Sequence, residues 1–190
     1  DVARRIGETA EARRVIQGVA ERHPESQAAQ EAWKSEVLEG GTPQEVLAAA
    51  RAFLIKDVTD QRALGAALRA AHTLGTTDTI LPIFEAAAAK GGAAHLRWLN
   101  RARIAVGTEK GLALHKSARH DDAVAMVEAL EERAGADASA WSILGGAWLE
   151  MRETKRAMSA YDRALEVDPK DNGALIGKAG ALASQGRARD

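Results

Sequence analysis

The feature that most constrains this chain is a pair of helical spacings that returns along the sequence. In residues 138–171, four positions at i, i+3, i+4 and i+7 share one helix face: Trp141, Leu144, Gly145 and Trp148. A second helix face follows on Ala157, Tyr161 and Ala164, and Pro169 then prevents the helix from continuing. We expect a short turn at residues 151–153. One such hairpin cannot bury its own apolar face, so it must stack on neighbours.

This order of residues resembles the tetratricopeptide repeat, a helix–turn–helix unit of about 34 residues. The resemblance covers nearly the whole chain and is strongest in residues 138–171. It implies an all-α fold in which antiparallel helix-hairpin repeats stack into a right-handed superhelical solenoid. It also implies a piece of a longer repeat protein, as does an N-terminus that begins at Asp1 without an initiator methionine.

Stepping the same period along the chain predicts one repeat array over residues 1–190. A partial repeat (1–26) precedes full repeats at 27–60 and 61–94, and the clear repeat at 138–171 is followed by a partial repeat (172–190). Gly75 is expected to end one helix, and Pro82 lies in the first turn of the next. Glycines 40 and 41 break the 27–60 hairpin, after which the chain restarts with a cap, a proline and a capping-box glutamate: Thr42, Pro43 and Glu45. In the partial repeat at 1–26, the spacing of a second helix is kept by Gly7, Ala12, Ile16 and Val19, and Pro24 closes that helix. In the partial repeat at 172–190, a first helix begins on Leu175, Ala179 and Leu182, with Lys178 at a position that prefers an apolar residue.

The register slips in the irregular repeat at residues 95–137. Its second helix, on Ala123, Val127 and Leu130, arrives later than the period predicts. We favour a short helix inserted between His95 and His120, because Gly107 lowers helix stability by about 1 kcal/mol and Thr108 can cap a restart. The alternative is an unusually long first helix.

Composition supports helices and argues against several functions. Much of the 46% hydrophobic content is alanine, the best helix former. The net charge of −1 lacks the basic excess of a nucleic-acid binder. Cysteine is absent, which rules out disulfides and thiolate metal sites, and no apolar run has the length of a membrane span. These features suit a soluble segment of the cytoplasm or periplasm.

The chain offers no recognisable catalytic, cofactor or metal motif. No histidine forms the i, i+4 pair of helical zinc enzymes, and the five-residue spacing of His115 and His120 is expected to point them to different helix faces. The segment from Gly173 to Lys178 lacks the spacing and hydroxyl residue of a phosphate loop. We therefore predict that the segment is not an enzyme and holds no cofactor or metal. Core packing is the better interpretation of the large aromatic residues: Trp33, Phe53, Phe84, Trp98, Trp141, Trp148 and Tyr161.

In proteins that resemble this chain, the first helices of successive repeats line a concave face that holds extended peptides. On that analogy, we predict a protein or peptide partner. An acidic segment of that partner would pair with Arg62, Arg69 and Arg103. The alternative is that these arginines are solvated or pair with Glu31 and Glu150, at a gain of under roughly 1 kcal/mol per exposed pair. The lysine and asparagine clamp of chaperone-binding repeats is absent. The predicted partner-binding residues are Arg62, Arg69, His72, Asn100, Arg103, Ser139, Ser142 and Leu149.

Three functions fit this interpretation. The leading one is a scaffold that recruits other proteins. The second is an accessory region that positions a substrate for a larger enzyme. The third is a self-assembly module, for which the repeat edges at Val2 and Leu182 would stack on copies of the chain.

Overall fold

Every regular element in the described part of the chain is a helix, so the all-α prediction is confirmed. The structure is a computed structural model that describes the backbone of residues 2–184 and the side chains of residues 11–183. It divides into two compact units, Asp1–Leu74 and Gly75–Asp190. The predicted repeat at 61–94 spans this division, because its two helices belong to different units. The division of the chain into six repeats and the right-handed superhelix stay predictions.

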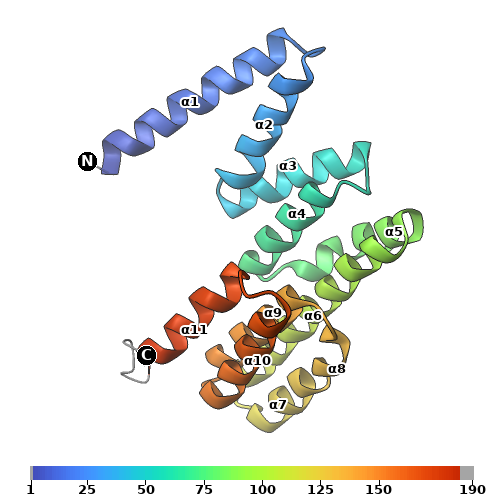
Figure 1. Cartoon of the computed structure of the whole chain (residues 1–190), viewed down its shortest axis with the longest axis vertical. Coiled ribbons are helices and arrows are strands. Elements are labelled where there is room, and N and C mark those ends of the chain that lie inside the picture. The colour runs from blue at the N-terminus through green and yellow to red at the C-terminus, as the bar shows by residue number, and fades with distance from the viewer. Residues whose placement is uncertain (1, 185–190) are drawn as a thin grey trace. The chain divides into compact units, whose positions relative to one another are not determined.

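The first unit contains four helices that follow one another along the chain (Figure 1). Helix α1 packs on α2, α2 on α3, and α3 on α4. Thr42 caps α3 as expected: its hydroxyl accepts from the Glu45 N–H at 3.4 Å, and the Glu45 carboxylate accepts from the Thr42 N–H at 2.9 Å. Gly75 has a φ of +66°, so it ends the last of these helices in a conformation that favours glycine. The helices are α1 (Val2–Arg22), α2 (Gln27–Glu39), α3 (Pro43–Lys56) and α4 (Gln61–Leu74).

The second unit begins with a 3-10 turn and continues with helices that pack mainly on α6 and α9 (Figure 1). Pro82 lies in the first turn of its helix, as the sequence indicated. Residues 151–153 form the predicted turn of the hairpin between α9 and α10. The elements are η1 (Thr77–Ile80), α5 (Leu81–Gly91), α6 (Ala93–Lys116), α7 (His120–Glu128), α8 (Glu131–Ala134), α9 (Ala138–Glu150), α10 (Thr154–Val167) and α11 (Asn172–Ser184).

The core of the second unit is built where α9 and α10 cross. Leu144 and Trp148 are buried, and Tyr161 lies directly over Gly145. A Cβ atom at Gly145 would lie only 2.5 Å from the Tyr161 ring, so only glycine, which has no Cβ, lets the ring pack this close to the α9 backbone. All seven helix-face residues predicted in residues 138–171 belong to one buried cluster or, for Gly145, lie within it.

A short polar side chain stands before four of the first helices of the predicted hairpins. Ser26 accepts from the Ala29 N–H, and Asp137 accepts from the Ala140 N–H at 3.2 Å. Asp60 accepts from the N–H groups of Arg62 and Ala63 at 3.1 Å, and Asp171 accepts from the Ala174 N–H at 2.8 Å. Each of these caps satisfies backbone donors that a helix start leaves unpaired.

Each capping aspartate also accepts from a side chain on the first helix of the preceding hairpin, which the aspartate ends. Lys34 on α2 pairs with Asp60. Arg101 on α6 donates from Nε to both Asp137 oxygens, at 2.6 and 2.9 Å. Ser142 on α9 donates to Asp171 at 2.7 Å. One carboxylate therefore joins the first helix of one hairpin to the N-terminus of the first helix of the next hairpin.

The prediction of an inserted helix between His95 and His120 is wrong. Helix α6 runs unbroken from Ala93 to Lys116, so the long first helix is correct. Gly107 and Gly111 do not break α6, because neighbouring side chains occupy the space beside them. A Cβ at either would lie 2.7 Å from a methyl group, of Leu130 and Val127 respectively. Thr108 is buried within the helix, and its hydroxyl donates to the Ala105 carbonyl at 2.8 Å.

The assignment of every large aromatic residue to the core is correct for four and wrong for three. Trp33, Phe53 and Trp98 are only half-buried. A cation covers two of these rings, with Lys34 Nζ 5.5 Å from the centre of Phe53 and the Arg101 guanidinium 4.7 Å from that of Trp98. An amphipathic cation thus takes the place of apolar neighbours on the outer side. The four buried residues are Phe84, Trp141, Trp148 and Tyr161.

We predict opposite effects of alanine at two adjacent glycines of α9. Gly145→Ala should lower the free energy of unfolding by about 1–3 kcal/mol, because the new methyl group displaces the Tyr161 ring. Gly146→Ala should raise it by about 0.5–1 kcal/mol, because no atom lies within 4 Å of its Cβ position and alanine favours a helix. Urea unfolding followed by circular dichroism measures both. A similar loss in the two variants would contradict the close contact of α9 and α10.

Candidate functional site

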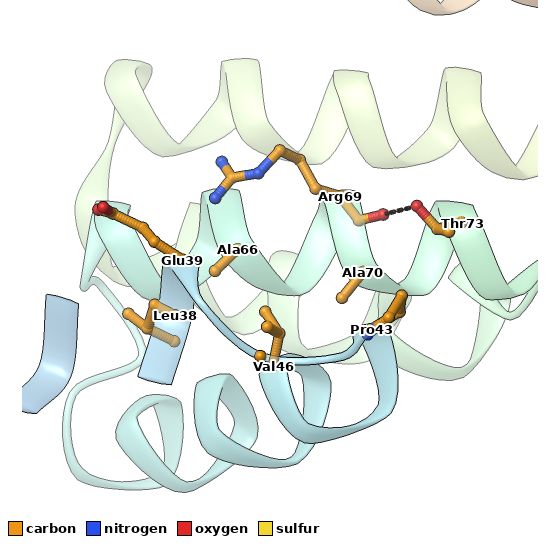
Figure 2. A pocket seen from close by; sticks show the side chains of 9 residues that line it. Leu38, Glu39, Pro43, Val46, Ala66, Arg69, Ala70 and Thr73 are labelled. Atoms are coloured by element: carbon orange, nitrogen blue, oxygen red, sulfur yellow. Dashed lines mark hydrogen bonds between the residues drawn. The ribbon is translucent and has the colours of Figure 1, made fainter. Parts of the chain in front are cut away.

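The first unit contains an open hollow of about 260 Å³ between α2, α3 and α4 (Figure 2). Its floor is apolar, and Leu38, Ala66 and Ala70 are among its buried residues. Its edge is polar, with a carboxylate, a guanidinium and a hydroxyl group. The lining residues are Leu38, Glu39, Gly41, Pro43, Val46, Ala66, Arg69, Ala70 and Thr73.

Two of the predicted partner-binding residues, Arg62 and Arg69, lie on the exposed side of α4 near this hollow. Arg69 lines it directly, and its side chain extends over the hollow toward the Glu39 side (Figure 2). Within the described part of the chain, no ion pair or side-chain hydrogen bond engages the Arg69 guanidinium. Its charge helps to lower the pKa of Glu39, while its N–H groups stay open to a ligand carboxylate.

Arg62, in contrast, is held by α2. Its Nη2 donates to Glu39 Oε1 and to Ser35 Oγ, each at 2.7 Å, and its Nη1 lies 3.9 Å from Glu31 Oε2. The hydrogen bond from Arg62, and then its charge, lower the pKa of Glu39 below its ordinary value. The ion pair with Glu31 that the alternative interpretation expected is therefore present for Arg62.

The other predicted residue of α4, His72, is half-buried near the end of the helix. On α6, Asn100 is half-buried and Arg103 is exposed. Arg103 Nη2 lies 3.6 Å from Glu85 Oε1 on α5, so this arginine also has an acidic neighbour. The second unit thus holds its predicted arginine in an exposed ion pair, an interaction worth about 0–1 kcal/mol.

The three remaining predicted residues lie on α9. Ser142 Oγ donates to Asp171 Oδ1 at 2.7 Å, and Ser139 Oγ lies 3.4 Å from Asp171 Oδ2. These hydroxyls therefore serve the cap of α11. Leu149 is half-buried and packs against the core cluster. The structure brings the two serines to one carboxylate but leaves their hydroxyls engaged within the chain.

Sequence reasoning missed the apolar floor of the hollow. Leu38, Val46 and Ala70 carry the ordinary helical pattern of core residues, and nothing in that pattern shows that the space above them stays open. Gly41 lines the hollow, but Arg13 and Glu45 crowd its Cβ position, so this glycine gives no signal of the opening.

Polar chemistry elsewhere is sparse in the described residues. No cluster of three or more histidine, aspartate or glutamate side chains among them could hold a metal ion. None of the described helices combines the length and the apolar character needed to cross a membrane. The edge of the first repeat at Val2, proposed for self-assembly, lies outside the described side chains.

We predict that the pKa of Glu39 depends on Arg62. In the wild type, a carbon-13 NMR titration should place the Glu39 carboxyl below its ordinary pKa, and Arg62→Gln should raise it. Because the folded-state pKa is lowered, the contribution of this pair to stability is present above the unfolded-state pKa and is lost as the pH falls through the folded value. An unchanged Glu39 titration in Arg62→Gln would show that Arg62 is not held by α2.

Comparisons with known proteins add little to this site. No family model matches the chain, and no curated protein matches it. Among solved structures it is similar to "MamA RS-1 ArsTM double mutant", at 17% sequence identity and a TM-score of 0.38, over 93% of this chain and 86% of that one. A likeness at this score bears no weight for function. The helical hairpins are seen directly in the chain, and the tetratricopeptide resemblance stays a prediction.

Proposed function

We propose that this chain is a non-catalytic scaffold that binds an extended peptide segment of another protein. The observation that carries the proposal is the hollow of the first unit, where an apolar floor lies beside the Arg69 guanidinium. Such a surface suits one apolar side chain and one carboxylate presented by the same short segment.

The size of the hollow favours a side chain over a small-molecule ligand. Pockets for cofactors and drug-sized molecules usually measure about 300–1,000 Å³ and enclose most of the ligand. The hollow here is smaller, at about 260 Å³, and it is open to solvent on one side. A peptide can insert one residue and leave the rest of its backbone across the rim.

The charges favour an acidic residue in that peptide. Arg69 is the predicted cation that forms no ion pair among the described residues, although its charge helps to lower the pKa of Glu39, whereas Arg62 and Arg103 already have paired acidic neighbours. Those two pairs are exposed and weak, so a ligand carboxylate can compete for them at a cost of under about 1 kcal/mol. Asn100, Ser139, Ser142, His72 and Leu149 stay candidate contacts for the remainder of a partner.

The test is a selection of random linear peptides on the immobilised chain, followed by fluorescence anisotropy of the enriched peptides. We expect peptides with an aspartate or glutamate beside a large apolar residue. Arg69→Glu should weaken their binding by about 10- to 100-fold, because a charge-assisted hydrogen bond of about 1.5–3 kcal/mol is replaced by repulsion.

The matched control is Arg14→Glu, which makes the same charge change at an exposed position of α1 that does not line the hollow. It should leave the peptide affinity unchanged. Equal affinity for the wild type and Arg69→Glu would refute the hollow as the binding point. Enrichment of peptides without acidic residues would refute the acidic ligand while leaving a scaffold function in place.

A second candidate function, self-association, is supported by large apolar side chains that are exposed on α1 and α11. Leu175 and Ile176 on α11 are 46% and 74% exposed, and Val15 on α1 is 60% exposed. Adjacent exposed residues of this size favour burial against another copy, by about 25 cal/mol per Å² of apolar surface.

Ile176→Glu should therefore shift the chain toward monomer if copies associate through α11. Light scattering over a dilution series measures this change, with Lys155→Glu on α10 as the control for added negative charge. A mass equal to one chain at every concentration of wild type would exclude self-association.

A further inference from the structure

His115 and His120 meet at the turn between α6 and α7. Their Nδ1 atoms are 2.9 Å apart, and the ring centres are separated by 5.1 Å at an interplanar angle of 64°. The expectation that these residues point to different helix faces is wrong, because they do not share a helix. Helix α6 ends at Lys116, and Ala118, with a φ of +60°, turns the chain so that α7 begins at His120.

Glu153 fixes the proton positions in this pair. His120 Nε2 lies 3.1 Å from Glu153 Oε1, and a carboxylate can only accept a hydrogen bond. His120 therefore carries its proton on Nε2, which leaves a lone pair on Nδ1. In the neutral pair, the hydrogen between the two Nδ1 atoms belongs to His115.

We propose that His115 and His120 form a binding site for a divalent transition-metal ion of the class that imidazole prefers, such as zinc, nickel or copper. The ion would lie beside the line between the two Nδ1 atoms and bind both, after the hydrogen between them has left His115 Nδ1. Two imidazole nitrogens, each about 2.0–2.1 Å from one metal, lie about 2.9 Å apart at a right angle and about 3.3 Å apart at the tetrahedral angle. The observed separation of 2.9 Å lies at the short end of this range, and both rings must turn so that their Nδ1 lone pairs converge on the ion.

The proton accounting is simple for the neutral pair. His115 moves its proton from Nδ1 to Nε2, which sits on a half-exposed side chain, and His120 keeps its proton on Nε2. No net proton is released. A doubly protonated His115 must lose one proton to bind, so the affinity falls at low pH.

Glu153 is a positioning residue in this site. A carboxylate that accepts a hydrogen bond from the far nitrogen of a metal-binding histidine fixes the tautomer. It also makes the other nitrogen a stronger electron-pair donor to the metal. The Arg156 side chain lies 3.9 Å from Glu153 and 3.3 Å from Glu128, so it anchors the carboxylate from α10. Together, α6, α7 and the turn before α10 hold the two rings.

Only two protein nitrogens contribute, so water completes the coordination. Structural zinc sites, in contrast, are closed by four protein ligands. Both histidines are partly exposed, which leaves room for water. We therefore expect an open site of modest affinity, independent of the hollow in the first unit.

The test is calorimetric titration of the full chain with zinc chloride and nickel chloride, combined with nitrogen-15 NMR of the imidazole rings. One ion per chain should bind, with shifts of both Nδ1 resonances. His115→Gln and His120→Gln should each remove the binding. Glu153→Gln can still accept the hydrogen bond but lacks the charge, so it should lower the affinity by about 10-fold and change the His120 tautomer populations.

The matched control is His23→Gln, which removes an exposed histidine that lies 3.4 Å from Glu25. It should bind metal as the wild type does. Circular dichroism and thermal unfolding verify that each variant folds. The proposal would be overturned if the wild type bound no metal, or if His115→Gln and His120→Gln each bound metal as tightly as the wild type does.

Discussion

The structure depends on a carboxylate placed at the junction between hairpins. Asp137 shows the arrangement most clearly, because its side chain is 11% exposed and accepts from both the Ala140 N–H and the Arg101 guanidinium. The cap starts α9, and the ion pair ties that start to α6. Asp60 and Asp171 repeat this arrangement with Lys34 and Ser142. A half-buried carboxylate with both oxygens engaged favours one direction of chain entry over others.

The second constraint is steric. Gly107, Gly111 and Gly145 sit where another helix or side chain comes within the space of a methyl group. In each case the glycine lowers the intrinsic stability of its own helix by about 1 kcal/mol, and packing against α7, α8 or α10 offsets that cost. This is why α6 stays continuous through two glycines that would weaken an isolated helix.

These two constraints explain which features of the fold could be predicted from the sequence alone. The hairpin at 138–171 and the cap at Thr42 follow from local spacing and side-chain chemistry, and both are present in the structure. The length of α6 does not follow, because the packing that retains Gly107 and Gly111 comes from residues downstream. The contact of His115 with His120 is missed for a related reason, since the helix ends between them.

The candidate site was predictable only in part. Arg62 and Arg69 were both expected at a binding face, but their environments differ through Glu39 and Ser35, which lie on another helix. An ion pair across helices leaves no mark in the local pattern of either one. The open floor of the hollow depends in the same way on side chains from three helices.

The capping carboxylates have a consequence for how such a chain can change over generations. Asp171 is satisfied by serines of its own hairpin and by a backbone N–H of the next helix. Every amino acid except proline supplies that N–H, so the cap itself asks little of the residue that donates it. A gene segment encoding residues 138–171 would carry its capping carboxylate with it. Packing would still constrain the next helix, because a Cβ atom at Gly177 would lie 2.3 Å from the Tyr161 ring.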